Sequence, residues 1–237
     1  MNILLLASTE EEIQGTLDYL ESEWDKKSFW EYEKDGTTIT TVVSGLGPMY
    51  AMYALTCHPS IKETDLILNP GIGAALSRTI DLGRVYAIEQ EAFGDIGMED
   101  SDGNFHSMHD LGWHNRNQHP FERGIIKPKN FHNPTYLPRA TGMTVNKLPG
   151  TYEALENFER KAHADIISLD GATIYFVAKM LNINVLSIKV ASRYVEPWLK
   201  VVPHFEGSVD QLNMRTIDVL KELIKTDKED PSPRLIR

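Results

Sequence analysis

The sequence predicts a single α/β domain in which helices pack on a central sheet. Short apolar runs, typical of strands buried on both faces, alternate with segments whose apolar residues recur at helical spacing. Such alternation of strands and helices is typical of layered α/β folds. The 237 residues are enough for one domain with a full-sized core, and no internal repeat divides them.

The first part of the chain is predicted to contain three buried strands, a hairpin and two helices. Residues 2–8 form the first apolar run, and Thr9 and Glu12 after it have the spacing of a capping box at the start of a helix. The remaining elements, in chain order, are a hairpin of residues 30–34 and 37–43 about Asp35-Gly36, a helix from Pro48, and strands at residues 65–69 and 84–90.

The second part of the chain starts with a long irregular stretch. Between Gly94 and about Pro138 no periodicity is visible, and a stretch of that length is usually functional or mobile. We expect order to return with a helix near residues 151–163, a strand at 165–168, a helix at 171–181, a strand at 185–190, and a final helix capped by Ser208. We assign residues 1–225 to the domain and residues 226–237 to a charged tail.

The composition argues against several classes of protein. The formal net charge of −10 disfavours nucleic-acid binding as the main role. The longest apolar run, residues 3–7, is far too short to span a membrane, and the N-terminus lacks the pattern of a signal peptide. Cys57 is the only cysteine, which excludes a disulfide framework and a zinc ribbon and fits a reducing compartment. We therefore expect a cytoplasmic protein whose partner is a small molecule.

We expect the protein to use no metal ion and no cofactor. Zinc sites often use two histidines on one helical turn together with a third ligand. His106 and His109 have a matching spacing, but Gly112, Asn115 and Asn117 disfavour a stable helix in that stretch. We interpret these histidines as loop residues.

Four segments that directly follow predicted strands carry residues suited to a ligand site. In layered α/β folds, ligands bind at the carboxyl ends of the strands. The segments are the glutamates at 10–12, the glycine turns at 44–47 and 70–75, and the SLDGA run at 168–172. Neither glycine turn fits a Walker loop or a dinucleotide fingerprint. Glu12 is either a capping residue or a catalytic carboxylate, and Asp170 is either a helix N-cap or a group that binds a sugar diol.

The order of these segments resembles the nucleoside phosphorylase and nucleosidase superfamily, which includes the methylthioadenosine/adenosylhomocysteine nucleosidases. The resemblance is carried by residues 2–13, 44–47, 69–76, 168–172 and 189–192, and residues 93–105, 141–151 and 192–197 resemble futalosine hydrolase. It implies a three-layer fold with a central mixed β-sheet flanked by helices. It also implies a purine nucleosidase of menaquinone biosynthesis, which releases hypoxanthine from futalosine or a related 6-oxopurine nucleoside.

The resemblance also implies roles for individual residues. Glu12 matches the family's water-activating general base, and Asp170 stands where a glutamate binds the ribose hydroxyls. Leu169 falls where a methionine packs against the sugar, and Lys189 stands where an arginine is usual. The residues expected to contact substrate are Gly45, Ile72, Gly73, Asn146, Leu169, Asp170 and Ser192.

Arg193 is the largest departure from the family. Adenine-specific relatives have an aspartate here that helps to protonate the purine, and futalosine hydrolases usually have an asparagine. An arginine stays charged at neutral pH and cannot serve as that acid, but it can donate hydrogen bonds to O6 or N7 of a departing 6-oxopurine. We expect it to take part in catalysis in this way; the alternative is that it pairs with a carboxylate such as Glu196, away from the base.

Two alternative functions, a phosphorylase and a non-catalytic binding protein, remain open, and we also expect a homodimer. A phosphorylase would need several arginines beside its glycine turns, and none occurs between Met1 and Pro70, so hydrolysis is favoured. A catalytically weakened nucleoside-binding protein is the second alternative. The resemblance implies a homodimer, and we expect aromatic side chains of the irregular stretch to form its apolar patch, namely Phe93, Phe105, Trp113, Phe121 and Phe131.

Overall fold

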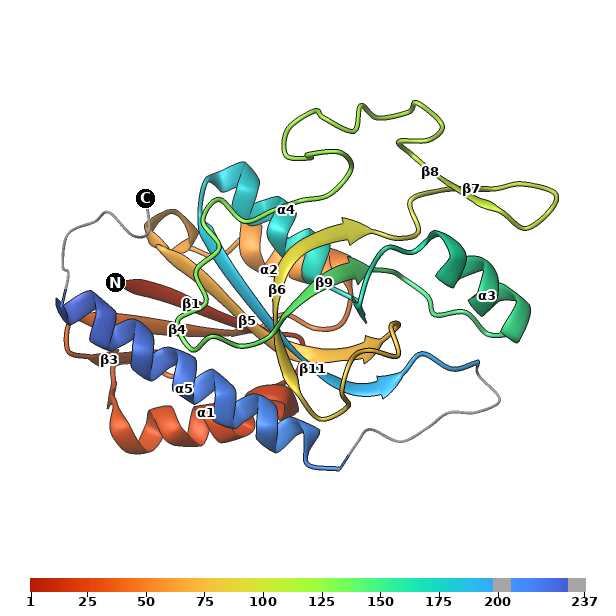
Figure 1. The fold of residues 1–237 in the computed structure, drawn as a ribbon. Coiled ribbons are helices and arrows are strands. Elements are labelled where there is room, and N and C mark those ends of the chain that lie inside the picture. Colours follow the sequence, from red (N-terminus) through yellow and green to blue (C-terminus); the bar gives the residue numbers. More distant parts are fainter. Residues whose placement is uncertain (198–205, 230–237) are drawn as a thin grey trace.

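The computed structural model describes residues 1–197 and 206–229, and its centre is a sheet with the strand order β10-β9-β6-β11-β5-β1-β4-β3-β2 (Figure 1). The strands are β1 (Asn2–Ala7), β2 (Asp25–Lys26), β3 (Glu31–Lys34), β4 (Thr37–Val43), β5 (Leu66–Ala75), β6 (Val85–Phe93), β9 (Arg139–Thr144), β10 (Ile166–Ser168) and β11 (Asn184–Tyr194). The pairings are both parallel and antiparallel, so the sheet is mixed, as expected.

The predicted hairpin is present. β3 and β4 pair antiparallel, and the two residues between them, Asp35 and Gly36, have φ values of 54° and 78°. Two positive φ angles in succession are typical of the tight turn that matches the twist of two adjacent strands. β4 in turn pairs with β1 in parallel, which brings the carboxyl ends of both strands to one edge of the sheet.

One end of the sheet curls back on itself. β10 pairs with β9 and also with the last residues of β5, so β5, β11, β6, β9 and β10 enclose a small barrel. We predicted that the strand at residues 65–69 would end at a glycine turn, which is wrong: β5 continues to Ala75. The reason is tertiary, because β11 pairs with β5 along its whole length and satisfies its backbone groups.

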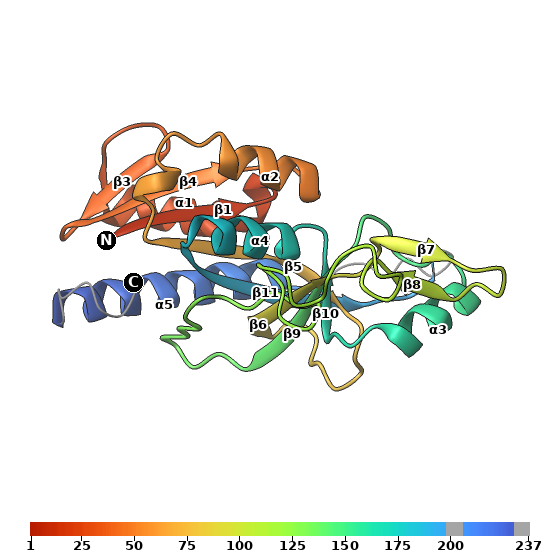
Figure 2. The ribbon, with the colours of Figure 1, turned by 90° about the horizontal axis from the view of Figure 1, so that it is seen from above.

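Helices cover both faces of the sheet (Figure 2). They are α1 (Glu10–Glu23), α2 (Pro48–Thr56), α3 (Tyr152–Lys161), α4 (Gly171–Leu181) and α5 (Ser208–Glu229), with a short 3-10 turn at Ile61–Glu63. Along β1, Leu4 and Leu6 face the core under α2 and α4, whereas Ile3 and Leu5 face the core under α1 and α5. This alternation gives the three layers that the resemblance implied.

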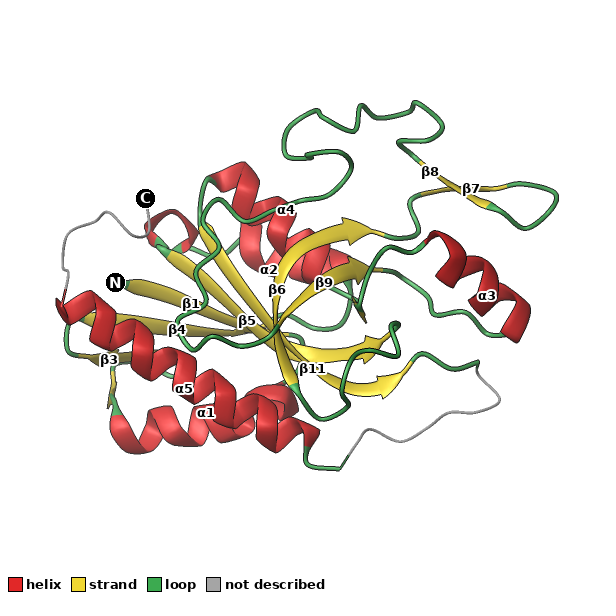
Figure 3. Ribbon diagram, viewed as in Figure 1, coloured by secondary structure: helices red, strands yellow, loops and turns green. Residues whose placement is uncertain are grey.

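The irregular stretch contains more structure than its composition indicated. A small hairpin of β7 (Gly97–Glu99) and β8 (Phe105–Ser107) precedes a long loop, drawn green between β8 and β9 in Figure 3. β9 was not predicted because its sequence, RATGMT, has neither an apolar run nor strict alternation. Its backbone is held between β6 and β10, so tertiary pairing defines this strand.

Three aromatic residues assigned to an exposed patch pack in or against the core instead. Phe121 is buried, and its ring packs against those of Phe93 and Phe176. Phe131 is partly buried against the core on the other face of the sheet, so the expected patch is wrong for Phe93, Phe121 and Phe131. At the end of the chain, α5 continues past the expected start of the tail at Thr226, and residues 230–237 lie outside the described residues. None of the described helices is both long and apolar enough to cross a membrane.

Candidate active site

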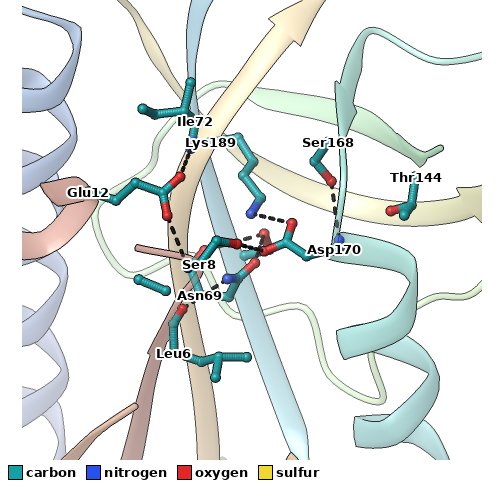
Figure 4. Close-up of polar contacts among 12 residues, drawn as sticks. Leu6, Ser8, Glu12, Asn69, Ile72, Thr144, Ser168, Asp170 and Lys189 are labelled. Atoms are coloured by element: carbon teal, nitrogen blue, oxygen red, sulfur yellow. Dashed lines mark hydrogen bonds and ion pairs between the residues drawn. The ribbon is translucent and has the colours of Figure 1, made fainter. Parts of the chain in front are cut away.

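Four polar side chains from distant parts of the sequence meet at the carboxyl end of β1, beside the middle of β5 and β11 (Figure 4). Ser8 follows β1, Glu12 lies in the first turn of α1, Asp170 precedes α4, and Lys189 lies within β11. All four are buried. Buried polar groups need partners: the side chains of Ser8, Asp170 and Lys189 bind one another, and Glu12 is bound by backbone N–H groups.

The Glu12 carboxylate is held by three backbone N–H donors. Its Oε2 accepts hydrogen bonds from the N–H groups of Ser8 and Thr9 at 3.0 and 3.1 Å. Its Oε1 accepts one from the Ile72 N–H of β5 at 3.1 Å. The bond from Thr9 belongs to the predicted capping box. The bond from Ile72 joins the carboxylate to the neighbouring strand, so Glu12 both caps α1 and faces the site.

A buried asparagine of α5 fixes the helix that carries Glu12. The Asn213 side chain donates to the backbone carbonyl of Glu12 at 3.1 Å. Its Oδ1 accepts from the N–H and the hydroxyl of Thr16 at 2.7 and 2.8 Å. Sequence analysis missed this residue, although an asparagine among the apolar positions of a helix is a usable signal.

Asp170 occupies the N-cap position of α4, but its side chain does not cap the helix. Its Oδ1 accepts from the Lys189 ammonium at 3.0 Å, and its Oδ2 accepts from the Ser8 hydroxyl at 3.0 Å. Other hydroxyls bind the first N–H groups of α4: Ser168 accepts from Gly171, and Thr144 accepts from Ala172. The Asp170 carboxylate is thereby free to face the site.

Lys189 and Asp170 form a buried ion pair. Only 1% of Lys189 is exposed, and Gly71 makes room for it, since a Cβ on Gly71 would lie 2.5 Å from the ammonium nitrogen. Burial favours the neutral form of Asp170, but the charge and hydrogen bond of Lys189 outweigh it and hold the pKa of Asp170 below its usual range. Asp170 is therefore ionised at neutral pH.

A second carboxyl group, that of Glu91 in β6, lies inside the same barrel and is also 1% exposed. Its burial raises its pKa to about 8; the charge of Asp170 adds to this effect, while the charge of Lys189 opposes it. Glu91 is thus mainly neutral at pH 7. Sequence analysis ended this strand at Gln90 and so missed Glu91, although an ionisable residue beside an apolar strand is a signal for a functional carboxyl.

Comparison with known proteins identifies the fold. The sequence matches no protein-family model and no curated protein. The structure matches the methylthioadenosine/adenosylhomocysteine nucleosidase of Campylobacter jejuni with a TM-score of 0.73 at 16% identity, over 95% of this chain and 99% of that chain. The chain has the nucleosidase fold.

Two further solved structures show the same fold. The futalosine hydrolase of Helicobacter pylori matches with a TM-score of 0.72 at 13% identity, over 95% of this chain and 98% of that chain. The nucleosidase of S. pneumoniae, solved with a transition-state inhibitor, matches with a TM-score of 0.68 at 18% identity, over 95% and 99% of the two chains. The expected architecture, a central mixed sheet flanked by helices, is confirmed.

Within the nucleosidase fold, most of the expected contact residues lie beside this cluster. The Gly45 N–H donates to the Ser8 carbonyl at 3.1 Å, and the Ser192 hydroxyl donates to the Gly73 carbonyl at 3.2 Å. Ile72 binds Glu12 through its backbone, and Leu169 is an exposed neighbour of Asp170. These positions come from the loop after β4, from β5 and β11, and from the turn before α4, and the fold brings them together.

Asn146 lies outside this hydrogen-bonded cluster. Its side chain donates to the Asp95 carboxylate at 3.1 and 3.2 Å, and its backbone N–H donates to the same carboxylate at 2.5 Å. These bonds join the loops that follow β6 and β9. A contact between Asn146 and a base would have to form beside Asp95, and it stays a prediction.

Arg193 lies near the end of β11, where a register shift interrupts the pairing with β5. Within residues 1–197 and 206–229, its side chain forms no hydrogen bond or ion pair. The alternative partner that we considered, Glu196, instead accepts from Arg78 at 2.8 Å. Glu196 is therefore not the partner of Arg193, and a contact between Arg193 and a base stays a prediction.

Proposed function

We propose that this protein is a purine nucleosidase that hydrolyses the N-glycosidic bond of futalosine or a related 6-oxopurine nucleoside and releases hypoxanthine. The observation that carries the proposal is the Glu12 carboxylate, held by three N–H donors beside the Asp170–Lys189 pair. The nucleosidase fold and the sequence resemblance support it. From the same resemblance we place the protein in menaquinone biosynthesis, and from its single cysteine, which fits a reducing compartment, we place it in the cytoplasm.

Glu12 is proposed as the general base. A carboxylate has about four acceptor sites, and three are occupied by N–H groups, so one site remains on Oε1. That site takes a proton from water while the water oxygen bonds to the anomeric carbon. The bond from that carbon to the purine nitrogen breaks, its electron pair leaves with the base, and a proton then neutralises the base. The reaction written in this way needs no cofactor.

Asp170 is proposed to bind the ribose hydroxyls. Lys189 and Ser8 use two of its roughly four acceptor sites, and a hydrogen bond from the Ser168 side chain also favours its charged form, so at least one site remains for a ribose hydroxyl. The Lys189 pair keeps the carboxylate ionised, and Ser8 fixes its orientation. Aspartate is one methylene shorter than the family's glutamate, and in this chain Lys189 and Ser8 support the shorter side chain.

Two cations, Arg78 and Lys189, are engaged by carboxylates and Arg193 is assigned to the purine, which favours water over phosphate as the attacking group. The Arg78 guanidinium is bound to Glu196, and it lies 4.4 Å from the centre of the Tyr194 ring. The Lys189 ammonium is bound to Asp170. A phosphorylase would need such cations for phosphate. Hypoxanthine release should therefore not depend on added phosphate, whereas a phosphorylase would require phosphate and yield a sugar 1-phosphate.

The guanidinium of Arg193 predicts a preference for 6-oxopurines. It can donate hydrogen bonds to O6 or N7 of hypoxanthine, whereas the 6-amino group of adenine would face a donor and lose a partner, at a cost of about 1–3 kcal/mol. We expect kcat/KM for futalosine or inosine to exceed that for methylthioadenosine or adenosine by about 10- to 100-fold. In Arg193→Met this ratio should shrink towards one. Wild-type turnover of methylthioadenosine equal to that of futalosine would contradict the role of Arg193.

We also propose that the protein is a homodimer, and the exposed face of α2 supports this. Helix α2 has no charged residue, and Met49 and Tyr53 are 80% and 70% exposed, with Leu46 and Tyr50 beside them. An apolar surface of this kind is typical of a protein interface. Light scattering at micromolar concentration should give a dimer for wild type and a monomer for Tyr53→Glu. Tyr136→Glu, which changes an exposed tyrosine far along the chain, should leave the dimer intact, and a wild-type monomer would contradict the proposal.

A further inference from the structure

The carboxyl group of Glu91 fills a space that two glycines leave open inside the barrel. A Cβ on Gly171 would lie 2.0 Å from Glu91 Oε1, and a Cβ on Gly142 would lie 2.3 Å from the same oxygen. Gly171 is the first residue of α4, and Gly142 lies in β9. Glu91 therefore touches the backbone of the turn that carries Asp170.

A hydroxyl group links Glu91 to that turn as well. Thr144 Oγ1 accepts the hydrogen bond of the Ala172 N–H at 2.7 Å and lies 3.4 Å from Glu91 Oε2. Both atoms are buried, so this link is not shared with bulk water. The start of α4 is thus supported from inside the barrel by the Glu91 and Thr144 side chains.

The charges around Glu91 come from three elements. Lys189 of β11 and Asp170 before α4 both interact electrostatically with it, as does the buried Tyr175 of α4, whose hydroxyl donates to the Ile88 carbonyl. With Glu91 neutral, the positive Lys189 is balanced by Asp170 alone. An ionised Glu91 would add an unbalanced negative charge and attract the same ammonium group.

We propose that Glu91 is a positioning residue for Asp170: its carboxyl group supports the first turn of α4 and leaves the Lys189 ammonium to Asp170. This inference rests on the proposed function, in which Asp170 binds the ribose. Among the described residues, the Glu91 carboxyl group hydrogen-bonds to Thr144 and not to Glu12 or Asp170, so it acts through Lys189 and the α4 turn.

The proposal gives Glu91 a distinct pH dependence. The pKa of Glu91 is about 8 in the folded protein and near 4.5 when the group is exposed. At any pH between these two values, unfolding therefore releases the proton of Glu91. Stability therefore falls as pH rises from about 4.5 to about 8, and this contribution is constant above that range. If substrate needs the neutral form, kcat/KM falls about tenfold between pH 7 and pH 9, as the neutral fraction falls from about nine-tenths to one-tenth.

The test compares wild type with Glu91→Gln, which keeps the shape of the neutral acid but cannot ionise. The melting temperature of Glu91→Gln minus that of wild type should increase between pH 5 and pH 8. Above pH 8 this difference should stay constant. The alkaline fall in kcat/KM for futalosine should disappear in Glu91→Gln. Glu89→Gln is the matched control, because Glu89 lies in the same strand but is bound to Arg139 at the surface, and it should show neither effect.

A second background tests the coupling to Asp170 without any turnover. Asp170→Asn removes the negative charge that raises the pKa of Glu91. In this background, the difference in melting temperature between Glu91→Gln and Glu91 should become constant at a pH below 8. The role of Glu91 would be overturned if the melting-temperature difference became constant at the same pH with and without Asp170→Asn. It would also be overturned if the melting temperatures of wild type and Glu91→Gln differed by the same amount at every pH. If no nucleoside is turned over, the proposed function fails, and the melting experiments still decide the coupling between Glu91 and Asp170.

Discussion

Replacing Glu12 by glutamine is expected to reduce hypoxanthine release from futalosine to less than about a tenth of the wild-type rate, since general-base catalysis typically contributes 100-fold or more. Glutamine keeps the length and one carbonyl oxygen, so it can still accept the hydrogen bonds of Ser8 and Thr9. Its amide nitrogen would face the Ile72 N–H and cannot take a proton from water. We expect folding and nucleoside binding to be largely retained, with a loss of stability of no more than about 1–3 kcal/mol.

The control for this variant lies one residue away. Glu11 is in the same first turn of α1 and is exposed, so Glu11→Gln changes the same charge near the same helix end. Glu11→Gln should turn over futalosine at the wild-type rate, and nucleoside-induced stabilisation should be measured for both variants. Glu12→Gln turnover above about a tenth of wild type would mean that Glu12 serves only to cap the helix.

Lys189→Met is expected to destabilise the protein by about 3–5 kcal/mol, because it leaves the Asp170 carboxylate buried without its cation. Methionine matches the length of the lysine stem, so the loss would come from the charge and not from a large cavity. Equilibrium unfolding in urea measures the effect. Adding Asp170→Asn should recover part of the loss, because the double variant removes the unpaired charge.

A surface ion pair provides the comparison for Lys189. Arg84 binds Asp81 at 3.1 Å, and both side chains are more than half exposed, so Arg84→Met should cost less than about 1 kcal/mol. A Lys189→Met variant that loses no more stability than Arg84→Met would contradict the view that the buried pair organises the site.

The elements that could be predicted from sequence are those with local signals. The apolar run of β1 and the Thr9–Glu12 capping box predicted strand and helix, and both are present. β9 and the second half of β5 could not be predicted, because strands on either side define them through pairing. The pattern of residues 139–144 carries no such information.

In the candidate site, too, some residues have a local sequence signal and others are brought together only by the fold. Glu12 and Asp170 follow strands, so the sequence alone pointed to them. The partners of Asp170 could not be read from the sequence, since its position equally suits a helix cap and only the fold brings Lys189 and Ser8 to it. Glu91 reaches the turn of α4 only because the barrel closes. Gly142 and Gly171 leave the space that its carboxyl group fills, and neither contact is visible in the sequence.

The most direct test of the proposed nucleosidase activity is turnover of futalosine in H₂¹⁸O without phosphate. Hydrolysis by water activated at Glu12 predicts free hypoxanthine and one ¹⁸O atom on the anomeric carbon of the sugar product, with both products formed by Glu12→Gln at less than about a tenth of the wild-type rate. Failure to release any base, while futalosine still raises the melting temperature, would contradict hydrolysis and indicate a nucleoside-binding protein.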